Sequence, residues 1–286
     1  MRILTYIAPY GGILVKNVMK SHFRLASSLV TELKKTGGIR VNDSIVTVRK
    51  LMDKDDKLTL IIPDDIPSDI VPVEGSLDIL YEDEDILCVS KPSGMPTHPS
   101  RNHYTDTLAN IVCHYYRDTN FTFRVSNRLD RYTSGVVIVA KNMYSASFLC
   151  TNEFRKTMHK TYYAICRGSF ENQEGTVNAP ISRLEGSVIK REVSPLGKYA
   201  ETHYSVVSEN NGTSLVKLMP KTGRTHQIRV HMAYIGHPLK NDFLYDDKCD
   251  GTSAFYLHCN KISFVHPING MPMEVEAPVS DKILNF

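Results

Sequence analysis

The 286-residue sequence lacks any apolar run near the roughly 20 residues that a helix needs to cross a bilayer, so we expect no membrane span. Its first residues, MRILTYIAPYGGILVK, lack a small-residue cleavage pattern and contain helix-breaking Pro9, Gly11 and Gly12, which argues against a secretory signal. The six cysteines include no CxxC pair. We therefore expect free thiols in a reducing cytoplasm, with neither a disulfide framework nor a zinc site.

Common cofactor and metal motifs are also missing. There is no GxGxxG, and KTGRT at residues 221–225 lacks the GxxxxGK[ST] spacing of a phosphate loop. His226 and His231 are five residues apart, whereas metalloproteases place two histidines four apart on one helix face. The sequence thus predicts no metal and no cofactor.

Charge is distributed unevenly behind a net value of +3. Residues 1–62 carry eleven Lys and Arg against five acids, whereas residues 63–85 carry nine acids and no base. The remainder is again basic, so two basic lobes flank an acidic connector. This pattern is compatible with a polyanionic partner and equally with ordinary solvated surface charge.

Two units are expected, residues 1–72 and residues 73–286. In the first, Leu25, Leu29 and Leu33 fall at helical spacing, short strands follow up to Ile62, and the Pro-rich acidic stretch PDDIPSDIVPVEG is typical of an extended linker. In the second, strands outnumber helices in mixed order, as in the β-branched run at residues 136–140. The predicted fold class is α+β, with a mixed, largely antiparallel sheet after a small N-terminal α/β module.

The stretch NRLDRYTSG at residues 127–135 places Asp130 between two arginines, just before that predicted buried strand. Asp130 could accept backbone hydrogen bonds in a turn that Thr133, Ser134 and Gly135 complete. Alternatively, a neighbouring guanidinium keeps the carboxylate ionised, which suits a nucleophile or an electrostatic stabiliser rather than a general acid. The stretch alone does not separate these alternatives.

The stretch KTGRTHQIRVH at residues 221–231 supplies complementary charge. Thr225 is expected to cap a helix, with His226 and Arg229 on the face opposite its apolar side. Arg229 could pair with a carboxylate or meet phosphates, or it could be a surface arginine, which is commoner.

Taken together, these segments resemble the RluA family of pseudouridine synthases. NRLDRYTSGVVIVAK is similar to the family signature HRLDxxTSG with its following strand and Lys, and KPSGMPTHP to the upstream KPxGxPxHP element. MHKTYYAICRG, KTGRTHQIRVHMAYIGHPLKND and the tail LHCNKISFVHPINGMPMEVEAP match further family elements in the same order over residues 78–286. Residues 12–62 resemble, more weakly, an S4-type RNA-binding module.

The resemblance implies isomerisation of uridine to pseudouridine in RNA, without metal or cofactor. Asp130 matches the catalytic aspartate, Tyr162 the active-site tyrosine, Arg229 the arginine that pairs with the aspartate, and Arg128 the arginine that fills the gap left by the flipped base. We also expect RNA contacts or base-flipping roles from Lys91, His98, Arg131, Arg224 and His226. The expected protein is a cytoplasmic monomer that acts on structured RNA, ribosomal rather than transfer RNA.

Some residues depart from the family pattern, and, separately, two rival functions remain open. Asn127 stands where His is common, Asn241 and Asp246 stand where glycines are usual, and Lys54-Asp55-Asp56 replaces the Gly-Asp turn of the N-terminal module. One rival is an inactive RNA-binding protein of the same fold. The other is a nucleoside or sugar hydrolase, which needs a second acid beside Asp130; the nearest are Glu153 and Asp242.

Overall fold

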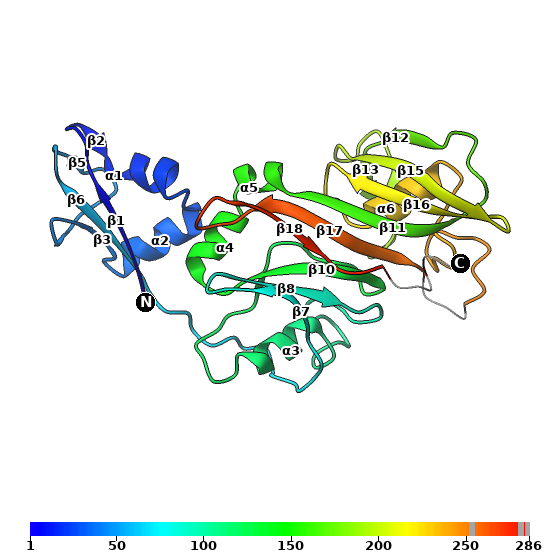
Figure 1. The fold of residues 1–286 in the computed structure, drawn as a ribbon, viewed down its shortest axis with the longest axis horizontal. Coiled ribbons are helices and arrows are strands. Elements are labelled where there is room, and N and C mark those ends of the chain that lie inside the picture. The colour runs from blue at the N-terminus through cyan, green and yellow to red at the C-terminus, as the bar shows by residue number, and fades with distance from the viewer. Residues whose placement is uncertain (252–254, 280–282, 284–286) are drawn as a thin grey trace.

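A computed structural model describes all residues except 252–254, 280–282 and 284–286 (Figure 1). Its central element is a mixed ten-stranded sheet of the described residues. The main path runs β12 (Glu174–Asn178), β15 (Glu201–Asn210), β16 (Thr213–Pro220), β11 (His159–Arg167), β17 (Leu257–Val265), β10 (Thr133–Ala140), β8 (Ile86–Lys91) and β7 (Asp78–Glu82). Two further strands join it, β18 (Pro272–Glu276) beside β17 and β9 (Arg124–Val125) beside β10.

All pairings in this sheet are antiparallel except that of β10 with β17, which is parallel. The predicted α+β class with a mixed, largely antiparallel sheet is confirmed. Because parallel strands start at the same edge, the segments that enter β10 and β17 lie next to each other, with Thr133 opposite Leu257. This edge receives the NRLDRYTSG segment.

Gly135 makes the parallel pairing possible. A Cβ at this position would lie 2.1 Å from the carbonyl oxygen of Cys259, and the backbone φ is +110°. Only glycine fits such a close backbone approach at this dihedral angle. Thr133 and Ser134 belong to β10, so the prediction that residues 133–135 complete a turn is wrong: the turn lies one step earlier, where the Thr133 N–H donates to the Asp130 carbonyl oxygen at 3.0 Å.

Helices are few and cover parts of the sheet. They are α3 (Leu108–Tyr115), α4 (Met143–Leu149), α5 (Asn152–Thr157) and α6 (Gln227–Tyr234). The α6 helix contacts β15, β16 and the small hairpin formed by β13 (Ile181–Arg183) and β14 (Arg191–Val193). No helix of the described residues is long and apolar enough to span a membrane.

The N-terminal unit has its own sheet, in the order β1 (Arg2–Ile7), β6 (Lys57–Ile62), β3 (Ile39–Val41) and β4 (Ser44–Ile45). Around it lie β2 (Ile13–Leu14), α1 (Val15–Asn17), the π-helical segment η1 (Val18–His22), α2 (Ser27–Lys35) and β5 (Leu51–Met52). The α2 helix includes Leu29 and Leu33, as predicted, but Leu25 lies before the helix; all three side chains are buried. The expected boundary near residue 72 falls between β6 and β7.

The two units touch at the end of α4 nearest α2 (Figure 1). Tyr144 of α4 is a buried member of the apolar cluster that otherwise comes from the N-terminal unit. The Ser147 hydroxyl accepts the Ala26 N–H at 2.6 Å, and Arg2 pairs with Asp85. The N-terminal unit is thus held against the large sheet by both apolar and polar contacts.

Candidate active site

The loop that carries Asp130 is held by the loop that follows β8. The Thr97 hydroxyl donates to the Leu129 carbonyl and the Ser93 hydroxyl to the Tyr132 carbonyl, both at 2.8 Å. Between them, Lys91 Nζ donates to the Arg131 carbonyl at 3.2 Å. The backbone carbonyls on both sides of Asp130 are therefore fixed. This fixes the orientation of the Asp130 Cα–Cβ bond.

Lys91 is the centre of this clamp. Its side chain has no exposed surface, and its ammonium also donates to the carbonyls of Pro92 at 2.9 Å and Met95 at 2.7 Å. Burial lowers the pKa of Lys91 to about 7, while the negative charge of Asp130 acts in the opposite direction. Since three backbone acceptors occupy its donors, Lys91 shapes the loop, and direct RNA contact does not fit its burial.

We expect Lys91→Met to loosen the Asp130 loop. Three carbonyls would lose their donor, which should lower the free energy of unfolding by about 1–3 kcal/mol and catalytic activity by roughly 10-fold. Urea unfolding and initial rates would measure the two effects. A variant as stable and active as the wild type would show that the clamp is dispensable.

Two basic side chains lie near one oxygen of Asp130, and only Arg229 is within hydrogen-bond distance. Arg229 Nη1 lies 3.5 Å and His226 Nε2 lies 3.9 Å from Oδ2. Within the described residues, the carboxylate accepts no backbone N–H, so the turn-residue interpretation of Asp130 finds no support. Oδ1 accepts no hydrogen bond from this part of the chain either, and it remains available to a ligand.

Arg229 has a second and closer carboxylate partner. Its Nε and Nη2 donate to Asp242 Oδ2 and Oδ1 at 2.6 and 2.7 Å, a bidentate pair in which both side chains are buried. Burial lowers the pKa of Arg229, but the hydrogen bonds and charge of Asp242, with a contribution from Asp130, outweigh it and raise the pKa. Arg229 is therefore not a surface arginine, and its contact with Asp130 is the weaker of two.

Aromatic rings enclose the same guanidinium. Its central carbon lies 4.4 Å from the ring centre of Phe255, 5.1 Å from that of Tyr245 and 5.5 Å from that of Phe243. Cation–π contacts of this kind are favourable when the cation is desolvated. Phe243 and Phe255 also line the cavity in front of Asp130.

The start of α6 differs from the prediction. Thr225 is not the cap: the helix begins at Gln227, and His226 precedes it with a left-handed backbone, φ 58°. The Gln227 side-chain amide oxygen accepts hydrogen bonds from the Thr222 hydroxyl at 2.7 Å and from the Arg224 backbone N–H at 3.0 Å. These two bonds hold the turn that precedes the helix. The left-handed conformation aims the His226 ring toward Asp130.

The cavity in front of Asp130 has a volume of about 380 Å³. This is within the range of small-molecule sites. Its walls combine charged, polar and aromatic groups, namely Asp130, Arg131, Tyr132, Ile189, His226, Arg229, Phe243, Leu244 and Phe255.

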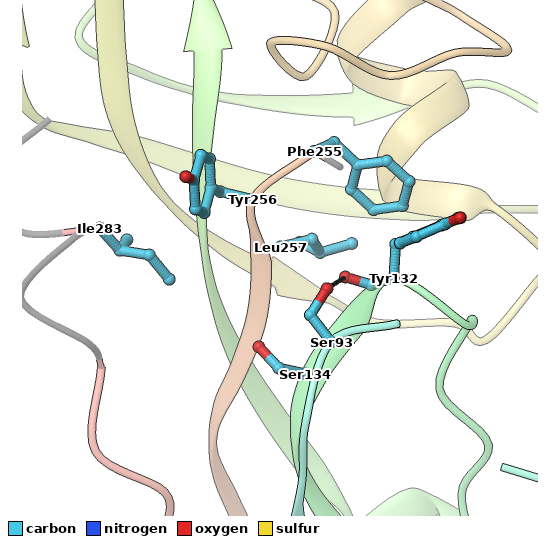
Figure 2. A pocket seen from close by; sticks show the side chains of 7 residues that line it. All are labelled: Ser93, Tyr132, Ser134, Phe255, Tyr256, Leu257 and Ile283. Carbon is cyan, nitrogen blue, oxygen red and sulfur yellow. Dashed lines mark hydrogen bonds between the residues drawn. The ribbon is translucent and has the colours of Figure 1, made fainter. Parts of the chain in front are cut away.

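A smaller cavity of about 150 Å³ shares Tyr132 and Phe255 with it (Figure 2). The hydroxyls of its two serines are already engaged. Ser93 bonds the Tyr132 carbonyl, and the Ser134 hydroxyl lies 2.8 Å from His258 Nδ1. The larger cavity is accordingly the candidate active site.

Tyr162 lies on β11, opposite Cys259 of β17. Its side chain is buried and does not line the larger cavity. Burial raises the pKa of Tyr162 well above its ordinary value, and Cys259 and the charge of Asp130 act in the same direction. The phenol of Tyr162 is therefore neutral in the free protein, and it lies close enough to Asp130 for that negative charge to contribute to the raised pKa.

The remaining candidates for RNA contact are exposed near this site. Arg131 donates through Nε to the Gly94 carbonyl at 2.9 Å, and Arg224 through Nε to the Tyr199 carbonyl at 2.9 Å. Arg128 is exposed and lies near His98. The pKa of His98 is lowered first by its own partial burial and then by the positive charge of Arg128. These side chains can reach a ligand, whereas Lys91 cannot.

The departures from the family pattern are accommodated locally. Asn127 is buried and bridges β10, donating to the Val136 carbonyl and accepting the Ile138 N–H, each at 2.9 Å. Asn241 has φ 64°, a left-handed conformation that asparagine tolerates. Asp246 is buried, pairs with Arg167 at 2.6 Å and accepts the Asn241 N–H at 2.8 Å. The loop bearing Asp242 is therefore well anchored.

A cluster of possible metal ligands lies elsewhere, at Asp83, Asp85 and His266. Its carboxylates already accept protein donors. Asp83 accepts the Ile86 N–H and His266 at 2.8 Å each, and Asp85 pairs with Arg2. The contact of Asp85 with Arg2 joins the two units, and protein hydrogen bonds and ion pairs already engage this cluster.

Comparison with known proteins gives consistent matches. The family model described as RNA pseudouridylate synthase matches residues 85–234. The uncharacterized RNA pseudouridine synthase YhcT of Bacillus subtilis is 36% identical over 274 residues, covering 94% of this chain and 91% of that protein. Ribosomal large subunit pseudouridine synthase D of Xylella fastidiosa is 34% identical, with 90% and 82% covered. The structure of human RNA pseudouridylate synthase domain containing 1 aligns at a TM-score of 0.60 and 27% identity, covering 72% of this chain and 86% of that one.

Proposed function

This chain belongs to the RNA pseudouridylate synthase family, and from that premise we propose that it isomerises specific uridines in ribosomal RNA, with Asp130 as the nucleophile. The observation that carries the proposal is the partly exposed Asp130 carboxylate in a cavity of about 380 Å³: Arg229 and His226 lie nearest Oδ2, and within the described residues no donor bonds Oδ1. A carboxylate with one occupied and one open oxygen is suited to attack.

The proposed reaction conserves every atom of the nucleotide. Asp130 Oδ1 bonds to C1′ of the ribose while the N1–C1′ bond breaks and its electron pair stays with the uracil ring. The ring turns, C5 bonds to C1′, and the carboxylate leaves. The proton on C5 is lost and N1 gains one, so no metal or redox cofactor enters the balance.

The described side chains supply the supporting roles in this proposal. A uridine must leave its stack to reach Asp130, at a cost of a few kcal/mol. Arg128, exposed and two residues before Asp130, would fill the vacancy, and the rings of Phe243 and Phe255 would offset the lost stacking. Arg131, Arg224 and the exposed rim would bind phosphates. Tyr162 is protonated in the free protein and lies behind the cavity walls, so the stacking role that the family resemblance implies would require the base to reach past them.

The N-terminal unit is assigned a second RNA contact in this proposal. Its exposed lysines, including Lys16, Lys20, Lys34 and Lys35, give it a basic surface, as expected of an S4-like module. The name of the Xylella relative supports ribosomal RNA as the target. We expect the protein to work as a monomer in the cytoplasm.

The rival functions fit the site less well. A hydrolase needs a second available acid, but both oxygens of Asp242 are bound to Arg229 in a buried pair. An inactive relative would not need to retain Asp130, Tyr162 and Arg229 together.

Single-base pseudouridine mapping in cells with and without the gene tests the proposal. We expect one or a few ribosomal RNA positions to lose pseudouridine without the gene and regain it with the wild-type protein. Loss confined to transfer RNA would overturn the ribosomal assignment. No change in any RNA, together with an inactive purified protein, would overturn the enzymatic proposal.

A further inference from the structure

The conformation of His226 is strained. A non-glycine residue in the left-handed region costs about 1–2 kcal/mol, and the surrounding contacts must maintain it. Here the Val230 N–H donates to the His226 carbonyl at 2.9 Å, and Gln227 fixes the preceding turn. The conformation places Nε2 at 3.9 Å from Asp130 Oδ2.

The other ring nitrogen of His226 meets Tyr245, at 2.9 Å between Nδ1 and the phenol oxygen. That oxygen also accepts the backbone N–H of Arg191, from β14, at 2.9 Å. A backbone N–H can only donate, so Arg191 takes one acceptor position of the phenol oxygen, and the phenol's own proton points to Nδ1 when His226 accepts there. Neutral His226 then carries its proton on Nε2, the nitrogen that faces Asp130.

We propose that Tyr245 is a positioning residue, which fixes the proton of His226 on Nε2, the nitrogen that faces Asp130 Oδ2 at 3.9 Å, and so leaves Oδ1 as the reactive oxygen. His226 and Arg229 would then act from two directions on the same oxygen, one as a neutral donor and one as a cation. The inference deepens the proposed function and depends on it for the role of Asp130.

The surroundings keep His226 neutral. Burial lowers its pKa, and the cations Arg229 and Arg191 act in the same direction, while the carboxylates Asp130 and Asp242 oppose them. A neutral ring has one N–H, so which nitrogen holds it matters for the Asp130 contact. The phenol of Tyr245 is also protonated, since burial raises its pKa.

Tyr245→Phe tests the inference, because it keeps the ring beside Arg229 and removes only the hydroxyl. We expect kcat for pseudouridine formation to fall about 10-fold, with KM for RNA unchanged. Nitrogen-15 spectra of His226 should change from one tautomer to a mixture, which a purely structural role would not predict. Tyr116→Phe is the matched control, since it removes a tyrosine hydroxyl bonded to Glu82 at 2.6 Å outside the site.

A double-mutant cycle with His226→Asn completes the test, since asparagine tolerates the left-handed backbone. We expect Tyr245→Phe to cause little further loss once His226 is replaced. Additive losses, or an unchanged tautomer and rate in Tyr245→Phe, would overturn the inference. If the wild type formed no pseudouridine, the proposed function would fail, while the tautomer spectra would still decide whether Tyr245 fixes His226.

Discussion

Asp130→Asn is expected to reduce pseudouridine formation by at least about 10³-fold, equivalent to roughly 4 kcal/mol of transition-state stabilisation. Asparagine keeps the shape of the side chain but replaces the attacking carboxylate with an amide. Product should be measured by mass spectrometry of nucleosides after incubation with RNA, without added metal. Retained activity would show that Asp130 is not the nucleophile.

The stability of this variant provides its internal control. The Asp130 side chain is one-third exposed, and its contacts with Arg229 and His226 are 3.5 and 3.9 Å long. We therefore expect the free energy of unfolding to stay within about 1 kcal/mol of the wild type. A lost activity with a preserved fold would then be chemical in origin. Release of free uracil from RNA by the wild type would instead favour a hydrolase.

Asp242→Asn is expected to lower both stability and activity. Removing one partner of a buried ion pair leaves an uncompensated charge, at a cost of about 3–5 kcal/mol. Among the described residues, the guanidinium of Arg229 would then have Asp130 as its remaining carboxylate partner. A tighter pair with Arg229 would make Asp130 a poorer nucleophile, so we also expect roughly 10²-fold lower kcat.

Asp246→Asn is the matched control for that variant. Asp246 is also buried, lies in the same loop and pairs with Arg167, but it does not contact Arg229. Asp246→Asn should also lower the free energy of unfolding, because it removes one partner of an ion pair. The folded molecules should nevertheless keep most of their activity. Chemical unfolding and rates per folded molecule separate the two effects. Equal activity losses in both variants would contradict the role assigned to Asp242.

The sequence indicated the sheet class and the position of Asp130 through strong local patterns. The β-branched run after Gly135 could only be a buried strand, and the aspartate at its start had to lie at a sheet edge. The helix with Ile228 and Met232 was equally readable from its apolar spacing. Such signals are local, and tertiary contacts did not override them.

The contacts around Arg229 and Lys91 were not predictable by the same reasoning. Lysine is usually exposed, and only the fold shows three backbone carbonyls converging on Lys91. Asp242 lies in a loop, where the sequence has no helical or strand periodicity. Its pairing with Arg229 therefore could not be predicted from the spacing of residues. A signal was nevertheless present, because Asp242 ends the family-like segment that also contains Arg229. Thr225 was the better cap by residue type, but the left-handed His226 occupies that position.

The shared apolar cluster at Tyr144 has a consequence for the order of folding. The N-terminal unit leaves the ribosome well before α4, yet one buried ring of its core belongs to α4. Its core is therefore complete only after the strand β10 and the following helix have been synthesised. Final docking of the N-terminal unit therefore follows the synthesis of α4, so this unit reaches its native packing only when part of the catalytic sheet is already made.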